Sequence, residues 1–251
     1  TLGGMMTMGI PTFRLEKDVV FSEIEVLREL GVEFKTGVEV GKDVTFDELR
    51  SQGYKAFYMA IGAQKSSPIG IPGEELDGVY GGIDFLRASL TGKAPKIGSS
   101  VAVIGGGNVS VDVARTAVRL GAENVMLVYR RGRDELKADD EEVEDALNEG
   151  VKLMLLRAPV EIVGENGAVK ALKLEIMKLG EPDASGRRSP VGTGEFETIE
   201  VDNVIGAIGQ HIDWSGIELG AMKLDKKGCV KVDELSYQTG EPDVFAGGDV
   251  V

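Results

Sequence analysis

Apolar residues along the chain fall into short runs separated by stretches with helical periodicity. Val101–Ile104 and Val125–Tyr129 are continuous apolar runs, which are typical of strands buried on both faces of a parallel sheet. Between them, Val111–Leu120 has the pattern of a helix. The order of strand, helix and strand predicts a βαβ unit, and therefore an α/β fold with a parallel, Rossmann-like sheet.

The first sixty residues carry a weaker but readable pattern. An amphipathic helix is predicted at Phe21–Leu30, followed by short strands at Val32–Phe34 and Val38–Val40. Thr45–Leu49 is predicted to be a helical turn, because Thr45 can cap it and Glu48 completes a capping box. Tyr54–Ile61 has the composition of a buried strand.

The rest of the chain alternates strands with turn-rich stretches. Residues 63–96 are rich in Gly, Pro and Ser around a short helix at Ile83–Leu90, which indicates a connection between domains. An acidic helix is predicted at Asp139–Asn148, a hairpin turn at Asn166-Gly167 and a polar loop at Gly180–Gly194. The remaining predicted strands are Val151–Leu156, Val160–Val163, Ala168–Met177, Glu197–Val201, Val204–Ile208, Cys229–Val232 and Val244–Ala246.

A glycine-rich turn follows the first strand of the βαβ unit. Gly105 permits a tight turn, and Gly107 allows the backbone to approach a pyrophosphate bound at the N-terminus of the next helix. Ser110 stands where a third glycine is usual, and it is small enough for close packing of helix on strand. The candidate binding residues of this turn are Gly105, Gly106, Gly107, Asn108 and Val109.

Two arginines end the second strand of the unit. An NAD site places an acidic residue there to bind the ribose 2′-hydroxyl, whereas this chain has Arg130 and Arg131, with Arg133 just beyond. Guanidinium groups match a 2′-phosphate. A pair of arginines alone would be a solvated strand end, but in this order the pattern favours NADP(H).

Composition narrows the classes of function. The 251 residues carry a formal net charge of −14, which argues against general binding of nucleic acid or an anionic membrane. Cys229 is the single cysteine, so neither a disulfide framework nor an iron–sulfur cluster is expected from these residues, and no His/Cys cluster suggests a metal site. With no signal peptide and no apolar run of about 18 residues, the expected location is cytoplasmic.

Three further segments point to a second, flat cofactor. Strands run into glycine at Gly62 and at Gly209, and Val244–Ala246 is followed by Gly247, Gly248 and Asp249. Glycine permits close approach of the backbone to a ring, and a carboxylate at a strand end can bind a hydroxylated ligand chain. Alone, the two glycine-ended strands are better explained as ordinary strand ends, and a surface turn explains the Gly-Gly-Asp segment equally well.

Taken in order, these segments resemble a known family, the FAD-dependent pyridine-nucleotide oxidoreductases of the glutamate synthase small (beta) subunit type. The electron-entry half of dihydropyrimidine dehydrogenase and the large subunit of NADH-dependent ferredoxin:NADP oxidoreductase belong to the same group. The resemblance covers nearly the whole chain. It rests on Gly9–Leu15, Ala60–Ala63, Gly70–Glu74, Val103–Asn108, Asp112, Ala114-Arg115, Tyr129–Arg131, Gly180–Asp183, Ala207–Gln210 and Phe245–Asp249.

The resemblance implies two dinucleotide-binding domains, with a complete NADP(H) domain at 96–209 inserted in an incomplete FAD domain. The FAD domain comprises 1–95, including a linker, and a return segment at 210–251. By the same resemblance, Gly105, Gly107 and Asn108 hold the NADP pyrophosphate, and Arg130 and Arg131 hold its 2′-phosphate. The remaining implied residues are Gly62 and Gly209 beside the cofactor and Gly248 with Asp249 at the FAD ribityl–pyrophosphate.

Two residues of the family pattern have open roles. Asp112 matches the pattern, with a charge on the helix surface as the alternative. Arg14 either faces the flavin or lies on the surface.

The implied reaction is hydride transfer between NADPH and FAD, after which electrons pass to an iron–sulfur domain or a partner redox subunit. No catalytic acid, base or nucleophile is expected, because the cofactors carry the chemistry. The family's glycine fingerprint for FAD is not found among these residues, so FAD is expected to be absent or weakly bound and the chain alone inactive. The alternatives are a non-catalytic NADP(H)-binding or assembly module, or an enzyme with a small-molecule substrate.

Overall fold

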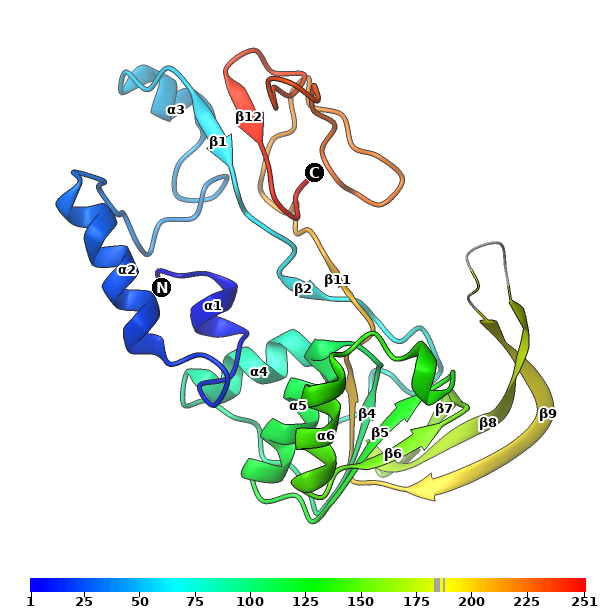
Figure 1. Ribbon diagram of the computed structural model, residues 1–251. Coiled ribbons are helices and arrows are strands. Elements are labelled where there is room, and N and C mark those ends of the chain that lie inside the picture. The colour runs from blue at the N-terminus through cyan, green and yellow to red at the C-terminus, as the bar shows by residue number, and fades with distance from the viewer. Residues whose placement is uncertain (183–185, 187) are drawn as a thin grey trace. The chain divides into compact units, whose positions relative to one another are not determined.

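The computed structural model describes residues 1–182, 186 and 188–251 (Figure 1). The chain forms two compact units. Unit 1 comprises Thr1–Met5, Lys17–Lys65 and Gln210–Val251, and unit 2 comprises Met6–Glu16 and Ser66–Gly209. Segments distant in sequence therefore complete both units.

A five-stranded parallel sheet is the centre of unit 2. Its order is β3-β10-β4-β5-β6, so the chain builds outward from β4 in one direction and returns to the other side of β4 with β10. This confirms the predicted α/β fold with a Rossmann-like parallel sheet. The strands are β3 (Val79–Gly81), β4 (Ser100–Ile104), β5 (Asn124–Tyr129), β6 (Lys152–Leu155) and β10 (Asn203–Gly206).

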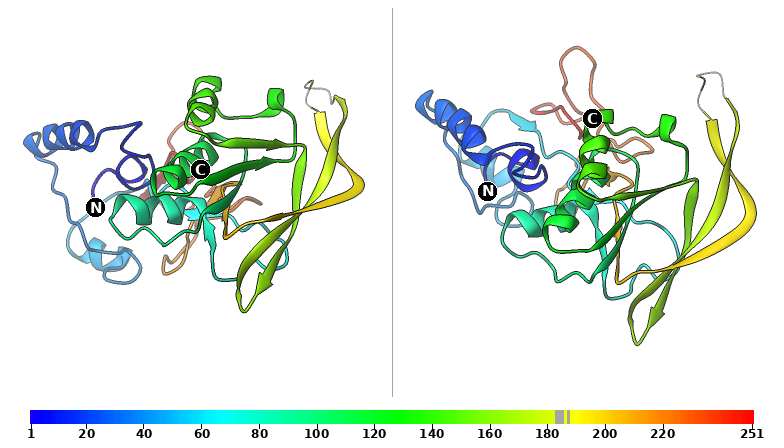
Figure 2. Two further views of the ribbon diagram at one scale, coloured as in Figure 1. Left: turned by 90° about the horizontal axis from the view of Figure 1, so that it is seen from below. Right: turned by 60° about the horizontal axis from the view of Figure 1, so that its bottom comes forward.

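Two different layers cover the faces of this sheet (Figures 1 and 2). Helices α4 (Gly82–Leu90), α5 (Asn108–Arg119) and α6 (Asp140–Asn148) pack on one face. An antiparallel sheet of β7 (Arg157–Glu165), β8 (Ala168–Pro182) and β9 (Arg188–Glu200) packs on the other. A short 3-10 helix, η1 (Arg133–Glu135), follows β5.

Strand β4 shows why the apolar runs have no polar alternation. Val101 and Val103 point into the core beneath the helices, whereas Ala102 and Ile104 point into the core beneath the antiparallel sheet. All four are at most 4% exposed. Successive side chains of a strand point to opposite faces, so a strand covered on both sides must be apolar at every position.

The antiparallel sheet confirms the predicted hairpin and extends it. Asn166 and Gly167 both have positive φ, 55° and 84°, as a two-residue turn of this kind requires. The polar loop predicted at Gly180–Gly194 is wrong over most of its length, because β8 continues to Pro182 and β9 begins at Arg188. Residues 183–185 and 187 of that loop lie outside the described residues.

Unit 1 is built around a parallel pair of strands, β1 (Phe57–Met59) and β12 (Val244–Ala246). The capping box is confirmed at α3 (Phe46–Ser51), where Thr45 accepts a hydrogen bond from the N–H of Glu48. The predicted helix at Phe21–Leu30 is present as α2 (Lys17–Glu29). The chain's remaining elements lie where it passes from one unit to the other: α1 (Met5–Met8) and the paired strands β2 (Lys65–Ser66) and β11 (Gln210–His211).

Three predicted strands and the predicted connection between domains differ in the structure. The strands predicted at Val32–Phe34, Val38–Val40 and Cys229–Val232 are not formed; Val32 and Val38 are about half exposed, because no neighbouring strand pairs with them. The helix predicted at Ile83–Leu90 is present as α4, but most of the stretch expected to connect domains, residues 63–96, belongs to unit 2, where Phe85 and Leu86 are buried in the core.

Within the part of the chain that the structure describes, no helix has the length and apolar character needed to span a bilayer.

Candidate nucleotide-binding site

The glycine turn lies at the carboxyl end of β4, and its three glycines face different surroundings. A Cβ on Gly105 would lie 2.4 Å from the carbonyl oxygen of Ala207, and a Cβ on Gly106 would lie 2.4 Å from the ring of Tyr129. A Cβ on Gly107 would meet no atom within 4 Å. Gly105 and Gly106 are therefore needed for packing, whereas Gly107 leaves open space at the start of α5.

The N-terminus of α5 faces that open space. Gly107 is its N-cap residue, and the Ser110 hydroxyl donates to the Gly107 carbonyl at 2.6 Å. A helix leaves its first N–H groups without intrahelical partners, and here they belong to Asn108 and Val109. These donors, at the positive end of the helix dipole, are suited to a pyrophosphate.

The loop after β5 is fastened to the glycine turn. The Gly106 carbonyl accepts hydrogen bonds from the N–H groups of Lys137 and Ala138, at 2.7 and 3.1 Å. The Asn108 side chain donates to the Asp139 carboxylate and accepts from the Asp139 N–H, both at 3.0 Å. Asn108 therefore serves the site by holding this loop, and only its backbone N–H faces the ligand side.

The same loop carries the arginine pair. Tyr129 donates its hydroxyl proton to the Glu135 carbonyl at 2.7 Å, which closes the loop over η1. Arg130 is exposed and has no hydrogen-bond or ion-pair partner among the residues described. Arg131 uses its Nε to donate to the Arg188 carbonyl at 3.1 Å, which leaves its terminal nitrogens available.

Arg133 differs from its two neighbours. It donates to the Glu144 carboxylate of α6 at 2.7 Å and lies 4.0 Å from Asp140. Acids therefore already balance its charge, although its Nη1 is buried without a hydrogen-bond partner among the described residues.

The site lies where the order of strands reverses. Strands β5 and β10 flank β4, and the Ala207 N–H donates to the Ile104 carbonyl at 2.7 Å, so the end of β10 abuts the glycine turn. In open parallel sheets this reversal is where ligands bind. Gly209 follows close by, with its carbonyl accepting from the Ser67 N–H at 2.9 Å.

Asp112 is not a charge on the helix surface, and Arg14 is not an unpaired surface arginine. Arg14 donates to both carboxylate oxygens of Asp112, at 3.1 and 3.2 Å, and pairs with Glu142 at 3.1 Å. Asp112 is 5% exposed. The ion pair therefore holds the Phe13-Arg14 segment against α5, a role that only a contact across 98 residues could reveal.

Burial raises the pKa of Asp112 to about 6, against the Arg14 guanidinium, which lowers it. Glu142 and Arg115 also act on this carboxyl, in opposite directions. Because the pKa of Asp112 in the folded state lies above the ordinary value of 3.8, the stability from this group is present below pH 3.8 and is lost as the pH rises through 6.

We therefore expect the unfolding free energy of the parent to fall relative to that of Asp112→Asn, by about 2–3 kcal/mol between pH 3.5 and 7.5. Urea unfolding of both proteins at a series of pH values measures this. The asparagine does not titrate, so the difference between the two unfolding free energies isolates Asp112 from the other titratable groups. A constant difference across this pH range would contradict the raised pKa.

In unit 1 the second candidate region comes together at one end of a strand pair. Met59 pairs with Ala246, and the Gly247 N–H donates to the Met59 carbonyl at 3.2 Å. Gly62 and Gly248 both have positive φ, and a Cβ on either would meet nothing within 4 Å. Asp249 follows and is exposed. Backbone that a ring or pyrophosphate can approach is thus present, with one carboxylate beside it.

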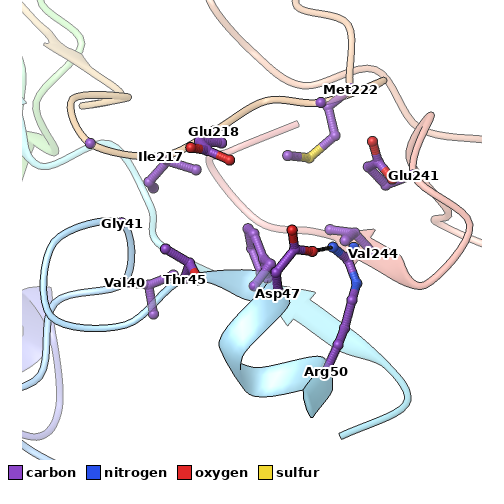
Figure 3. Close-up of a pocket in the computed structure, with 13 residues that line it drawn as sticks. Val40, Gly41, Thr45, Asp47, Arg50, Ile217, Glu218, Met222, Glu241 and Val244 are labelled. Atoms are coloured by element: carbon purple, nitrogen blue, oxygen red, sulfur yellow. Dashed lines mark hydrogen bonds and ion pairs between the residues drawn. The ribbon is translucent and has the colours of Figure 1, made fainter.

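A pocket of about 230 Å³ also lies in unit 1 (Figure 3). Its strongest cation, Arg50, donates to Asp47 at 2.6 Å and to Asp243 at 2.7 and 2.8 Å. Those carboxylates raise the pKa of Arg50 and balance its charge. Arg50 is therefore not available to bind a phosphate, and we do not place a nucleotide in this pocket.

Acidic residues of α6 and of the position after it are paired with arginines of α5. Arg115, whose side chain is 8% exposed, contacts Glu142, Asp145 and Glu149 at 3.0, 3.1 and 2.8 Å. Arg119 also binds Glu149, and its hydrogen bond is the main cause that lowers the pKa of that carboxyl to about 2. Across the residues that the structure describes, no group of His, Cys, Asp and Glu is arranged to hold a metal ion.

Proteins of similar sequence confirm the resemblance. The NADP(+)-dependent formate dehydrogenase subunit beta of Moorella thermoacetica is 44% identical over 99% of this chain and 36% of its own length. The glutamate synthase [NADPH] small chain of Escherichia coli is 36% identical over the whole of this chain and 56% of its own length. The chain thus spans roughly a third to a half of these relatives.

Solved structures share the fold. The Mycobacterium tuberculosis FprA complex with NADPH superposes with a TM-score of 0.78 at 21% identity, over 98% of this chain and 69% of that one. Thioredoxin reductase of T. acidophilum superposes with a TM-score of 0.70 at 20% identity, over the whole of this chain and 79% of that one. Residues 18–251 match the model of one family. The chain belongs to the pyridine nucleotide-disulphide oxidoreductase family.

Proposed function

We propose that this chain is the NADPH-handling part of an oxidoreductase in which a hydride passes between NADPH and FAD. We assign residues 96–209 as its NADP(H)-binding domain, and 1–95 with 210–251 as parts of its FAD domain. The observation that carries the proposal is the arginine pair at the end of β5, on a loop hydrogen-bonded to the glycine turn. These hydrogen bonds hold the glycine turn and the arginine pair, the two groups that we assign to phosphate binding, next to each other.

The residues of the glycine turn and the arginine pair have different roles in binding the nucleotide. The N–H groups of Asn108 and Val109 bind the pyrophosphate, and Gly107 leaves room for it. Arg130 and Arg131 bind the 2′-phosphate and so select NADPH over NADH. Unit 2 contributes to catalysis by orienting the nucleotide. This role requires no acid or base from the chain.

Unit 1 supplies residues that fit FAD. Gly62 and Gly248 present backbone that no side chain covers, and Asp249 places a carboxylate beside it. When bound, FAD would accept the hydride and release electrons singly. We propose an iron–sulfur domain or partner subunit as their acceptor, because the relatives named above are subunits by name.

A non-catalytic NADP(H)-binding module is the alternative function. An absorbance scan of the purified chain, before and after addition of FAD and desalting, separates the two. Flavin bands in the blue and near ultraviolet that are retained, or weak but saturable binding in a titration with FAD, support the oxidoreductase; no binding of FAD at any concentration supports the module.

Calorimetric titration tests the nucleotide site itself. We expect the parent to bind NADPH at least tenfold more tightly than NADH, because only NADPH offers the arginines a phosphate. Gly107→Ala should weaken NADPH binding by at least about tenfold, because its methyl group enters the pyrophosphate space. With φ of −114° and no neighbour within 4 Å, alanine fits the apo fold, so the melting temperature should stay within about 2 °C.

Gly106→Ala is the matched contrast, because its methyl group would meet the Tyr129 ring and the melting temperature should fall. Unchanged NADPH affinity in Gly107→Ala would place the pyrophosphate elsewhere.

A further inference from the structure

The hairpin of β8 and β9 returns to the strand end that carries the arginine pair. Arg131 donates from Nε to the carbonyl of Arg188, the first residue of β9, at 3.1 Å. The two residues are 57 positions apart. The segment had been expected to be a polar loop, so its sequence alone gave it no place in the site.

Further contacts hold the hairpin at this position. Leu156, in a left-handed conformation with φ of 55°, donates its N–H to the Arg131 carbonyl at 3.0 Å. The Leu156 carbonyl accepts from the N–H of Met177 in β8 at 2.9 Å. Leu179 of β8 packs beside Gly132, with its Cδ1 3.5 Å from the position of a Cβ there. Main-chain and apolar contacts thus attach β8 and β9 to the Arg131-Gly132 segment.

The cations gathered here differ in how far their charge is balanced. Arg133 is bound to Glu144. The side chains of Arg130 and Arg188 are exposed, and neither has a hydrogen-bond or ion-pair partner within 1–182, 186 and 188–251. Like charges held on neighbouring backbone segments repel one another unless an anion lies between them. In a chain with a net charge of −14, this cationic group stands out.

We propose that Arg188 is a third cationic residue for the 2′-phosphate of NADPH, supplied by the hairpin in place of Arg133. The inference rests on the proposed function, because it assigns a further specificity residue to the same site. The backbone of Arg188 is held by Arg131, and its guanidinium is free to close on a phosphate bound by Arg130 and Arg131. The phosphate then lies between two elements that join only in the folded unit.

Arg188→Ala tests the inference without disturbing the anchor, since Arg131 binds the main-chain carbonyl of residue 188. We expect its NADPH affinity to fall about tenfold and its NADH affinity to stay within about twofold. Adenosine 2′,5′-bisphosphate should lose about the same factor and adenosine 5′-monophosphate none, which locates the effect at the 2′-phosphate. Arg188→Lys should recover part of the affinity, because lysine keeps the charge but lacks the planar fork.

Lys170→Ala is the control, since it removes the same charge from the opposite end of the hairpin, where Lys170 makes only an exposed 3.9 Å pair with Glu165. Its affinities should equal those of the parent. A parent that prefers NADPH, together with an Arg188→Ala variant of unchanged preference, would overturn this inference alone. Equal affinity of the parent for NADPH and NADH would overturn the proposed function, and the inference with it.

Discussion

Replacing both Arg130 and Arg131 with alanine should lower the affinity for NADPH by about 100-fold and leave that for NADH within about threefold. A hydrogen bond to a charged group contributes about 1.5–3 kcal/mol, and two such contacts are lost with the 2′-phosphate. Each 1.4 kcal/mol is a factor of ten in affinity, so about 3 kcal/mol gives the expected loss. NADH has no such phosphate, so its binding should depend only on the glycine turn.

Calorimetry or fluorescence titration with both nucleotides measures this. The control is the double variant Lys152→Ala with Lys170→Ala, which removes the same charge from unit 2. Lys152 begins β6, at the sheet edge opposite the site, where it donates to Asn124 at 2.8 Å. If the control lost as much NADPH affinity as the arginine variant, the effect would be one of net charge and the arginines would not be the 2′-phosphate site.

Arg115→Ala should lower the unfolding free energy by about 3–5 kcal/mol, the range for breaking a buried ion pair by removing one partner. Its guanidinium bridges Glu142, Asp145 and Glu149 of α6 and its flank, and it also lies over the Phe13 ring with 4.7 Å to the centroid. Without it these carboxylates repel one another and part of their charge stays in a low-dielectric setting. The packing of α6 against α5 would then be loosened.

Urea unfolding followed by circular dichroism measures the loss, with the slope of the transition checked for two-state behaviour. Lys170→Ala serves again as the control, because an exposed ion pair contributes about 0–1 kcal/mol. A loss below about 1 kcal/mol in Arg115→Ala would show that solvent already satisfies the acids of α6.

Elements whose signal is local were predictable from the sequence. The apolar run of β4, the capping box at Thr45 and the Asn166-Gly167 turn each depend on a few adjacent residues, and all three are present. Whether a segment finds a partner strand was less predictable. Residues 180–182 and 188–194 read as a polar loop, yet they belong to β8 and β9, where Pro182 pairs with Arg188. Val32 and Val38 have strand propensity but no strand to pair with.

The candidate site divides in the same way. The glycine turn, the arginine pair and the order of strand, helix and strand could be read from the sequence, because periodicity and turn chemistry act over a few residues. The partners of the charged side chains, in contrast, were decided only by the tertiary structure. Arg14 meets Asp112 across 98 positions, and Arg131 meets the Arg188 carbonyl across 57. Such pairs form because packing of the sheet layers brings distant segments within hydrogen-bonding distance, and no local pattern encodes that approach.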